Sequence, residues 1–143
     1  MELPPAPEPV ASYVPVVQAG SLLFVAGQVP TIDGRLLHPG KLGQHVSVEM
    51  GQEAAARAAL QGLSAIREHL GGSLDRLQRV LQVTVFVAAD AEFIEHPKVA
   101  NGASDAFVAA LGAEGRHARA AVGVASLPLG ASVEVTVTAE VSE

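Results

Sequence analysis

HARAAVGVASLPLGASVEVTVTAEV, residues 117–141, contains two strand-like runs joined by a Leu-Pro-Leu-Gly turn. The second run, residues 132–141, alternates apolar with polar side chains, which is typical of a β-strand with one buried face. The first run, residues 117–124, is small and apolar after its initial histidine, except at Arg119. Because a guanidinium is costly to bury without an anion beside it, Arg119 indicates a partner carboxylate, either within this protein or on a ligand.

Alternation along the two runs predicts which side chains share a face. The valines of the second run lie on one face, which we expect beneath helices, and Glu134 lies on the other. In the first run the equivalent apolar face consists of Ala118, Ala120, Val122 and Val124. Arg119 and Glu134 are therefore predicted to share the helix-free side of the sheet, and His117 would share the face of Arg119.

Periodicity and turn-forming residues predict the remaining elements. Strands are predicted at residues 13–17, 21–26, 80–87, 117–124 and 132–141. Apolar residues at three- and four-residue spacing predict helices over residues 46–70 and 99–111. Residues 27–44 are predicted as a loop, and a helical turn is expected to begin at Ser73. This order predicts an α+β fold with both helices on one face of the sheet.

Composition limits the class of protein. The 143 residues are 49% hydrophobic and 17% charged, which indicates one globular domain over residues 1–143. The absence of cysteine excludes disulfides, thiolate nucleophiles and zinc-thiolate sites. A net charge of -6 without a Lys/Arg cluster argues against nucleic acid as a partner. The five histidines lack the spacing of metal ligands, so no metal site is predicted.

The N-terminal segment and the apolar runs indicate the cellular location to expect. Residues 1–10 are acidic and rich in proline, which predicts an extended arm and not a signal peptide. No apolar run approaches the roughly 20 residues needed to cross a bilayer. A cytoplasmic protein with no membrane partner is the simplest expectation.

Apolar side chains occur on both faces of two predicted strands, residues 21–26 and 80–87. A single chain would expose many of them to water on the helix-free face of the sheet. Packing against other copies of the chain is therefore expected, with Arg119 near a subunit boundary.

From residue 13 to residue 141 the chain resembles the Rid or YjgF-like family of reactive intermediate deaminases. The most specific match is Ala-Arg-Ala-Ala-Val-Gly-Val, followed by Leu-Pro and Val-Glu-Val, with Arg119 and Glu134 at the family's signature positions. Residues 25–30 and 83–87 also match. The resemblance implies a chorismate-mutase-like α+β fold with a mixed sheet, a homotrimer with ligand clefts between subunits, and no metal or organic cofactor.

The same resemblance implies hydrolysis of 2-imino acids to 2-oxo acids and ammonia. Arg119 would bind the carboxylate of this small metabolite, and Glu134 would activate the attacking water or carry a proton to the departing ammonia. Further substrate contacts are implied for Tyr13, Gly27, Asn101 and Ala121, with the glycine and the alanine acting through backbone N–H groups. Many deaminating members have a serine or threonine where this chain has Ala26, so one hydroxyl beside the expected pocket is missing.

Each of these residues also has a simpler structural interpretation. Arg119 would pair with Glu134 across adjacent strands, or Glu134 would be an ordinary exposed carboxylate. Tyr13 would contribute packing, Asn101 would cap the second helix, and Gly27 would begin a loop.

Two other functions stay open at the level of the sequence. One is a non-catalytic binder of small carboxylates such as 2-oxo acids. The other is a ribonuclease or translation inhibitor, an activity attributed to relatives of the family. The acidic charge and the 3% aromatic content fit the second of these least well, since they supply neither phosphate contacts nor stacking surfaces.

Overall fold

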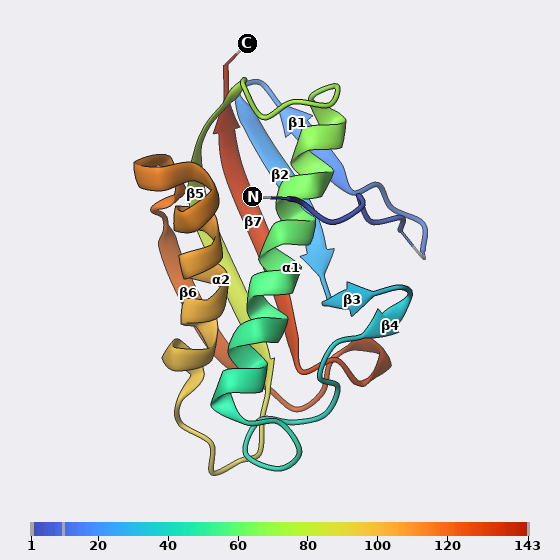
Figure 1. Ribbon diagram of the computed structural model, residues 1–143, viewed down its shortest axis with the longest axis vertical. Coiled ribbons are helices and arrows are strands. Elements are labelled where there is room, and N and C mark those ends of the chain that lie inside the picture. Colours follow the sequence, from blue (N-terminus) through green and yellow to red (C-terminus); the bar gives the residue numbers. More distant parts are fainter. Residues whose placement is uncertain (1, 10, 143) are drawn as a thin grey trace.

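Two helices lie side by side on one face of a five-stranded sheet in the computed structural model (Figure 1). The structure describes residues 2–9 and 11–142. The predicted α+β class, with both helices on one sheet face, is confirmed. No helix in the described residues combines the length and the apolar character needed to cross a membrane.

The main sheet is mixed. Its strands are β1 (Val16–Ala19), β2 (Leu22–Gln28), β5 (Leu77–Ala88), β6 (Ala118–Val124) and β7 (Val133–Val141). They lie in the order β1-β2-β7-β5-β6, with β5 and β6 parallel and the other three neighbouring pairs antiparallel. All five predicted strands are therefore present, with shifts of a few residues at their ends.

A small hairpin occupies part of the segment predicted as a loop. β3 (Thr31–Ile32) pairs with β4 (Arg35–Leu36) around Asp33 and Gly34, whose φ angles are 53° and 78°. Positive φ at both central residues is the geometry of a type I′ turn, for which Asp-Gly is a favoured pair. The loop prediction was wrong here, and also at Gly27, which belongs to β2.

The two predicted helices are α1 (Val48–His69) and α2 (His96–Leu111). Ser47 caps α1, since its Oγ accepts a hydrogen bond from the Met50 N–H at 3.2 Å. Pro97 lies in the first turn of α2, where its missing N–H removes no helical hydrogen bond. This helix consequently begins at His96, ahead of the apolar pattern at residue 99. Residues 73–76, where a helical turn was predicted, form a non-helical turn that leads into β5.

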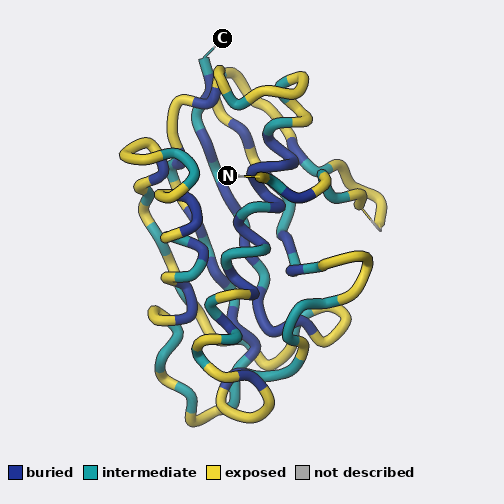
Figure 2. Tube along the Cα trace, in the orientation of Figure 1, coloured by how far each residue is buried: buried dark blue, intermediate teal, exposed yellow. Residues whose placement is uncertain are grey.

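The core lies between the helices and the central strands (Figure 2). The valine face of β7 is buried, which confirms the predicted orientation of this strand. Val83 and Val85 of β5 are buried beside it, and Leu63 of α1 and Phe107 of α2 close the core from above.

Strand β6 turns its predicted apolar face away from the helices. Parallel pairing aligns Arg119 with Val83, so Arg119 lies on the helix side of the sheet. The opposite face of β6 carries Ala118, Ala120 and Val122, which are exposed. Both faces of this strand consist largely of small side chains, so the sequence pattern did not reveal which face the helices cover.

Glu134 lies on the helix-free face of β7, where it pairs with Phe86 of β5. Arg119 and Glu134 therefore do not share a face, and the prediction that they would was wrong. The error came entirely from β6, because the orientation of β7 was predicted correctly.

The N-terminal arm, residues 2–9, has no regular secondary structure and passes over α1 (Figure 1). Pro4 is buried, and its carbonyl oxygen accepts a hydrogen bond of 2.6 Å from the Ser64 hydroxyl of α1. The remaining residues of the predicted arm, Met1 and Val10, lie outside the described residues. A direct hydrogen bond thus fastens the arm to the domain.

Two helical glycines differ in the space around them, and this difference allows a paired test of helix packing. A Cβ at Gly102 of α2 would overlap the Gln52 carbonyl of α1, whereas a Cβ at Gly62 would lie 3.5 Å from Val137. We expect Gly102→Ala to lower the free energy of unfolding by about 1–3 kcal/mol, because the helices must separate. We expect Gly62→Ala to raise it by up to about 1 kcal/mol through helix propensity. Urea unfolding followed by circular dichroism measures both, and equal effects would contradict the close approach of α1 and α2.

Candidate functional site

Arg119 lies on the edge strand β6 and is held by α2. Its Nη1 donates to Asn101 Oδ1 at 2.8 Å and to Ser104 Oγ at 3.1 Å, and its Nη2 donates to the Pro97 carbonyl at 3.4 Å. Asn101 and Ser104 are three residues apart and thus lie on one side of the helix. All three acceptors are neutral, and Glu134 is not among them. The alternative in which Arg119 forms an ion pair with Glu134 is therefore excluded. Asn101 lies inside α2 and not at its start, so its interpretation as a helix cap was wrong.

Part of the Arg119 guanidinium remains available for a ligand. The group carries five N–H donors in a planar fork. The three hydrogen bonds above occupy both hydrogens on Nη1 and one on Nη2. The Nε–H and one Nη2–H form no hydrogen bond with the described residues. The Nε and Nη2 edge of a guanidinium matches the two oxygens of a carboxylate. No Asp or Glu among the described residues forms an ion pair with Arg119.

An open cavity of about 490 Å³ adjoins Arg119. Ser104, His117 and Arg116 also line it, together with the exposed Asp105. His117 lies beside Arg119 as predicted, and its Nε2 is 2.9 Å from Ser104 Oγ. Ser104 was not singled out from the sequence, although its three-residue spacing from Asn101 places both on the same helix face.

The backbone N–H of Ala121 points to the free edge of the sheet. Backbone groups alternate sides along a strand. The Val124 carbonyl accepts a hydrogen bond from the Ala89 N–H at 3.2 Å, on the side of β6 that faces β5. The N–H of Ala121, three residues earlier, therefore points away from β5. It lies two residues from Arg119, at the open edge of the sheet.

Glu134, Gly27 and Tyr13 form a second group of predicted site residues. A Cβ at Gly27 would lie only 2.6 Å from Glu134 Oε2, so the absence of a side chain makes room for the carboxylate. Gly27 and the half-exposed Tyr13 line one cavity of about 310 Å³. Burial raises the pKa of the Glu134 carboxyl above its usual value. Glu134 is thus not the ordinary exposed carboxylate considered from the sequence.

Gln61 of α1 holds the chain that follows Gly27. Its side-chain amide donates to Gln28 Oε1 at 3.3 Å and to the Val29 carbonyl at 2.9 Å, and its Oε1 accepts from the Thr31 N–H at 2.8 Å. Gln61 is 4% exposed, so this network is shielded from water. The sequence indicates no role for Gln61, because nothing in a helical pattern reveals that a distant turn needs hydrogen bonds.

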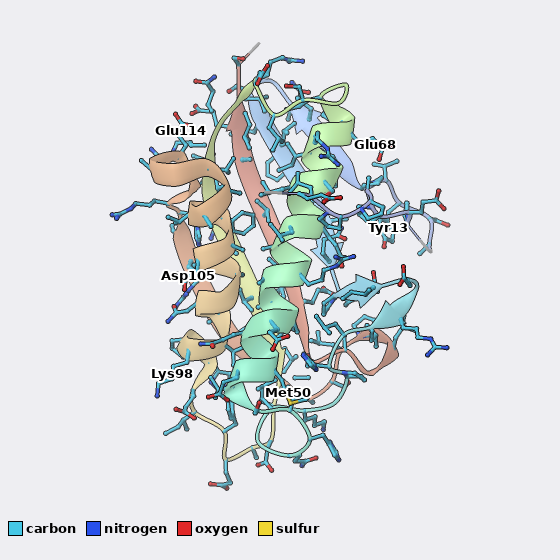
Figure 3. All side chains as sticks on the ribbon, viewed as in Figure 1. Tyr13, Met50, Glu68, Lys98, Asp105 and Glu114 are labelled. Carbon is cyan, nitrogen blue, oxygen red and sulfur yellow. The ribbon has the colours of Figure 1, made fainter. Side chains whose placement is uncertain are left out.

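The two groups of predicted site residues lie far apart within one chain. Arg119 and Ala121 are on β6, and Gly27 is on β2, with β7 and β5 between them. Neighbouring strands lie about 4.8 Å apart, so the three spacings from β2 to β6 amount to roughly 14 Å. Figure 3 shows Asp105, which lines the Arg119 cavity, and Tyr13 on opposite sides of the molecule. A single chain therefore does not bring the predicted residues into one pocket.

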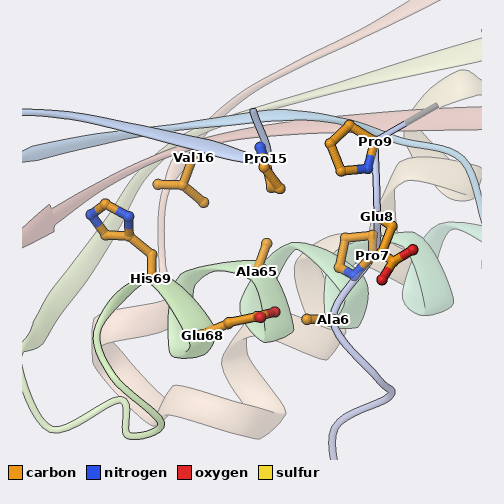
Figure 4. Close-up of a pocket in the computed structure, with 9 residues that line it drawn as sticks. All are labelled: Ala6, Pro7, Glu8, Pro9, Pro15, Val16, Ala65, Glu68 and His69. Atoms are coloured by element: carbon orange, nitrogen blue, oxygen red, sulfur yellow. The ribbon is translucent and has the colours of Figure 1, made fainter. Parts of the chain in front are cut away.

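Another cavity, of about 360 Å³, lies between the N-terminal arm and the end of α1 (Figure 4). Glu8, Glu68 and His69 line it, and it contains none of the predicted site residues. Residues 7–9 of the arm also line the Tyr13 cavity, so the arm separates the two spaces. Among residues 2–9 and 11–142, no three His, Asp or Glu side chains gather in a way that could hold a metal ion.

Comparisons with known proteins cover nearly the whole chain. Residues 4–141 match the family model described as Endoribonuclease L-PSP. Protein TCP17 of Trypanosoma cruzi is 46% identical over 143 residues, which are 99% of this chain and 89% of that protein. A crystal structure from Agrobacterium tumefaciens, of a protein with unknown function, is 43% identical, with a TM-score of 0.91 over 94% of this chain and 86% of that one. The structure of E. coli TdcF with bound serine is 25% identical, with a TM-score of 0.68 over 96% of this chain and 94% of that one.

The raised pKa of Glu134 has a consequence for stability. Folding favours the protonated form of the Glu134 carboxyl group. Its contribution to the stability of the protein is therefore present at pH values below the unfolded-state pKa, and it is lost as the pH rises through the folded-state pKa. We expect Glu134→Gln to be more stable relative to wild type at pH 7 than at pH 3. Urea unfolding at several pH values measures this difference. Glu114→Gln, at an exposed position, controls for the loss of one charge, and a Glu134→Gln effect that does not vary with pH would contradict the burial effect.

Proposed function

The chain belongs to the endoribonuclease L-PSP family, the Rid or YjgF-like family that its C-terminal motif resembles, and we propose that it hydrolyses reactive 2-imino acids to 2-oxo acids and ammonia. The observation that carries this proposal is the free edge of the Arg119 guanidinium beside an open cavity. A cation held only by neutral acceptors attracts an anionic ligand, and its two free donors fit a carboxylate.

In the proposed reaction Arg119 binds the substrate carboxylate through its Nε and Nη2 edge. The N–H of Ala121 adds a third donor, and Asn101 keeps the guanidinium in place. The carbon of the imine is bonded directly to the carboxylate carbon. Binding of the carboxylate therefore places this carbon beside a positive charge, which favours attack by water.

Glu134 supplies the proton transfers. Its carboxylate accepts a proton from the water that attacks the carbon of the protonated imine, which gives the neutral carbinolamine. Glu134 returns this proton to the amine nitrogen, the C–N bond breaks, and the ammonia takes the hydroxyl proton as the 2-oxo carbonyl forms. A raised pKa suits both steps, since the carboxyl holds the proton more readily at working pH. The hydroxyl found in many relatives beside Gly27 is missing at Ala26, so in this chain the positioning of the water falls to Glu134.

Assembly would unite the two groups of residues. We propose that the Arg119 edge of one chain meets the Tyr13, Gly27 and Glu134 surface of a second copy, and that three such contacts close into a trimer with three equivalent clefts. Exposed apolar side chains on the helix-free sheet face support this arrangement. Val17, Phe24 and Val122 are 54%, 47% and 40% exposed in the single chain, and assembly would remove them from water.

The serine bound to TdcF also supports a small carboxylate as ligand. Serine carries the carboxylate that Arg119 is proposed to bind, on a carbon bonded to nitrogen. The proposed substrate has the same carboxylate and nitrogen on one carbon, as an imine.

Removal of Arg119 tests the proposal directly. We expect Arg119→Ala to lower kcat/KM for a 2-imino acid at least about 100-fold, because two charge-assisted hydrogen bonds of about 1.5–3 kcal/mol each are lost. The imine is generated in place by an amino-acid oxidase, and release of the 2-oxo acid is followed with and without the protein. Arg35→Ala, at an exposed position of β4, is the matched control. Equal rates of 2-oxo acid release for wild type and Arg119→Ala would contradict the proposal.

Glu134→Gln distinguishes the enzyme from a carboxylate binder in the same assay. Lost turnover with retained 2-oxo acid binding, measured by calorimetry, supports catalysis. Tight binding by a wild-type protein that does not turn over the imine would indicate the non-catalytic carboxylate binder. RNA cleavage that depends on Arg119 would instead indicate the ribonuclease.

Mixing two inactive variants tests whether the site is shared between chains. Arg119→Ala chains retain Glu134, and Glu134→Gln chains retain Arg119. When the two are refolded together at equal amounts, we expect about one quarter of the clefts to contain both wild-type residues, since each cleft draws each half at random. Activity should return to about that share of the wild-type rate. Two variants that stay inactive when mixed, although their mixed oligomers form, would contradict the shared cleft.

A further inference from the structure

Ser104 and His117 are linked by hydrogen bonds whose direction can be assigned. His117 Nδ1 is 2.6 Å from the Gly115 carbonyl oxygen, which only accepts, so Nδ1 carries the proton. In the neutral ring Nε2 is then an acceptor, and it lies 2.9 Å from Ser104 Oγ. The hydroxyl hydrogen of Ser104 therefore points at His117. Arg119 Nη1 donates to the same oxygen at 3.1 Å.

This arrangement has the three parts of an activated nucleophile. A hydroxyl lies within hydrogen-bond reach of a base, and a third group fixes the tautomer of that base. Here the third group is the Gly115 carbonyl, and the ring is also held edge-on against Phe107, with ring centroids 5.6 Å apart. The positive charge of Arg119 favours the alkoxide that forms when His117 accepts the proton.

The pair also has access to a ligand. Ser104, His117 and Arg119 line the same open cavity of about 490 Å³. Ser104 and His117 are only partly buried, so neither is sealed in the core. Arg119 donates to Ser104 through Nη1 only, so its Nε and Nη2 atoms remain available to bind an anionic group of the ligand.

We propose that Ser104 is a nucleophile with His117 as its general base, and that this pair hydrolyses small esters that carry a carboxylate. The carboxylate would bind the free edge of Arg119 and bring the ester carbonyl to Ser104. The chemistry does not depend on the imine hydrolysis proposed above, because the attacking oxygen belongs to Ser104 and Glu134 has no part in it.

The reaction proceeds in two balanced steps. Ser104 Oγ attacks the ester carbonyl carbon while its proton passes to His117 Nε2. The bond to the alcohol oxygen breaks, and the alcohol leaves with that proton, which gives an acyl-Ser104. Water, deprotonated by His117, then attacks the acyl group, releases the carboxylic acid and restores the Ser104 hydroxyl.

Covalent labelling tests the nucleophile. A fluorophosphonate forms a bond from phosphorus to a reactive serine oxygen and releases fluoride, and the modified residue is identified by mass spectrometry of peptides. We expect a single adduct on Ser104 in the wild-type protein. We expect His117→Asn to slow its formation at least about 100-fold, because the amide can still donate to the Gly115 carbonyl but is no base.

Matched variants separate this role from a structural one. Ser126→Ala and His69→Ala alter an exposed serine and an exposed histidine outside the cavity, and both should label at the wild-type rate. Circular dichroism and gel filtration verify that His117→Asn is folded. A wild-type protein without an adduct on Ser104, or equal labelling in His117→Asn, would show that the hydrogen bonds only orient Arg119 and would overturn the proposal.

Ester turnover tests the substrate class. After subtraction of the rate without protein, hydrolysis of mono-4-nitrophenyl adipate should exceed that of 4-nitrophenyl hexanoate at least about tenfold, because only the first has a carboxylate for Arg119. Ser104→Ala should abolish the turnover of both. Equal rates for the two esters would overturn the carboxylate specificity, and unchanged rates in Ser104→Ala would overturn the nucleophile.

Discussion

The parallel pairing of β6 with β5 is the constraint on which the arrangement of the site depends. It aligns Arg119 with the buried Val83 and so directs the guanidinium toward α2. A shift of the pairing by one residue would move every side chain of β6 to the other face. Arg119 would then point away from Asn101 and Ser104, and neither the free donor edge nor the cavity beside it would exist.

The helix supplies what an edge strand lacks. A guanidinium at the edge of a sheet would be mobile in water, but Asn101 and Ser104 hold it in one orientation without neutralising its charge. This combination is suited to an anionic ligand, because the desolvation of the cation is partly compensated and its attraction for an anion is retained. The same hydrogen bonds also join Arg119 to His117 through Ser104. The proposed carboxylate recognition and the proposed nucleophile therefore depend on one helix face.

The separation of the two groups of site residues explains why the fold of a single chain would be insufficient for imine hydrolysis. Glu134 lies on the helix-free face of β7 and Gly27 lies on β2, and the strand β5 separates both from Arg119 on β6. A second copy is a natural source of the missing half, since the exposed apolar residues of the sheet also need a cover. Family membership rests on the match over residues 4–141, whereas the reaction and the assembly rest on the physical arguments above.

Much of the architecture could be read from the amino-acid order. The alternating valines of β7, the helical spacing of α1 and the turn residues around them are local signals, and they predicted the strands, the helices and the buried face of β7. Arg119 also stood out by itself, because a cation in an apolar run requires polar partners. The face of β6 was different. Alternation divides a strand into two faces but does not say which one is covered, and both faces of β6 are small and apolar apart from Arg119. Only the pairing with β5 and the packing of α2 decided which face is covered. The same long-range packing brought Ser104 of α2 to His117 and Arg119, since side chains far apart in the chain meet only after the sheet and the helix have packed.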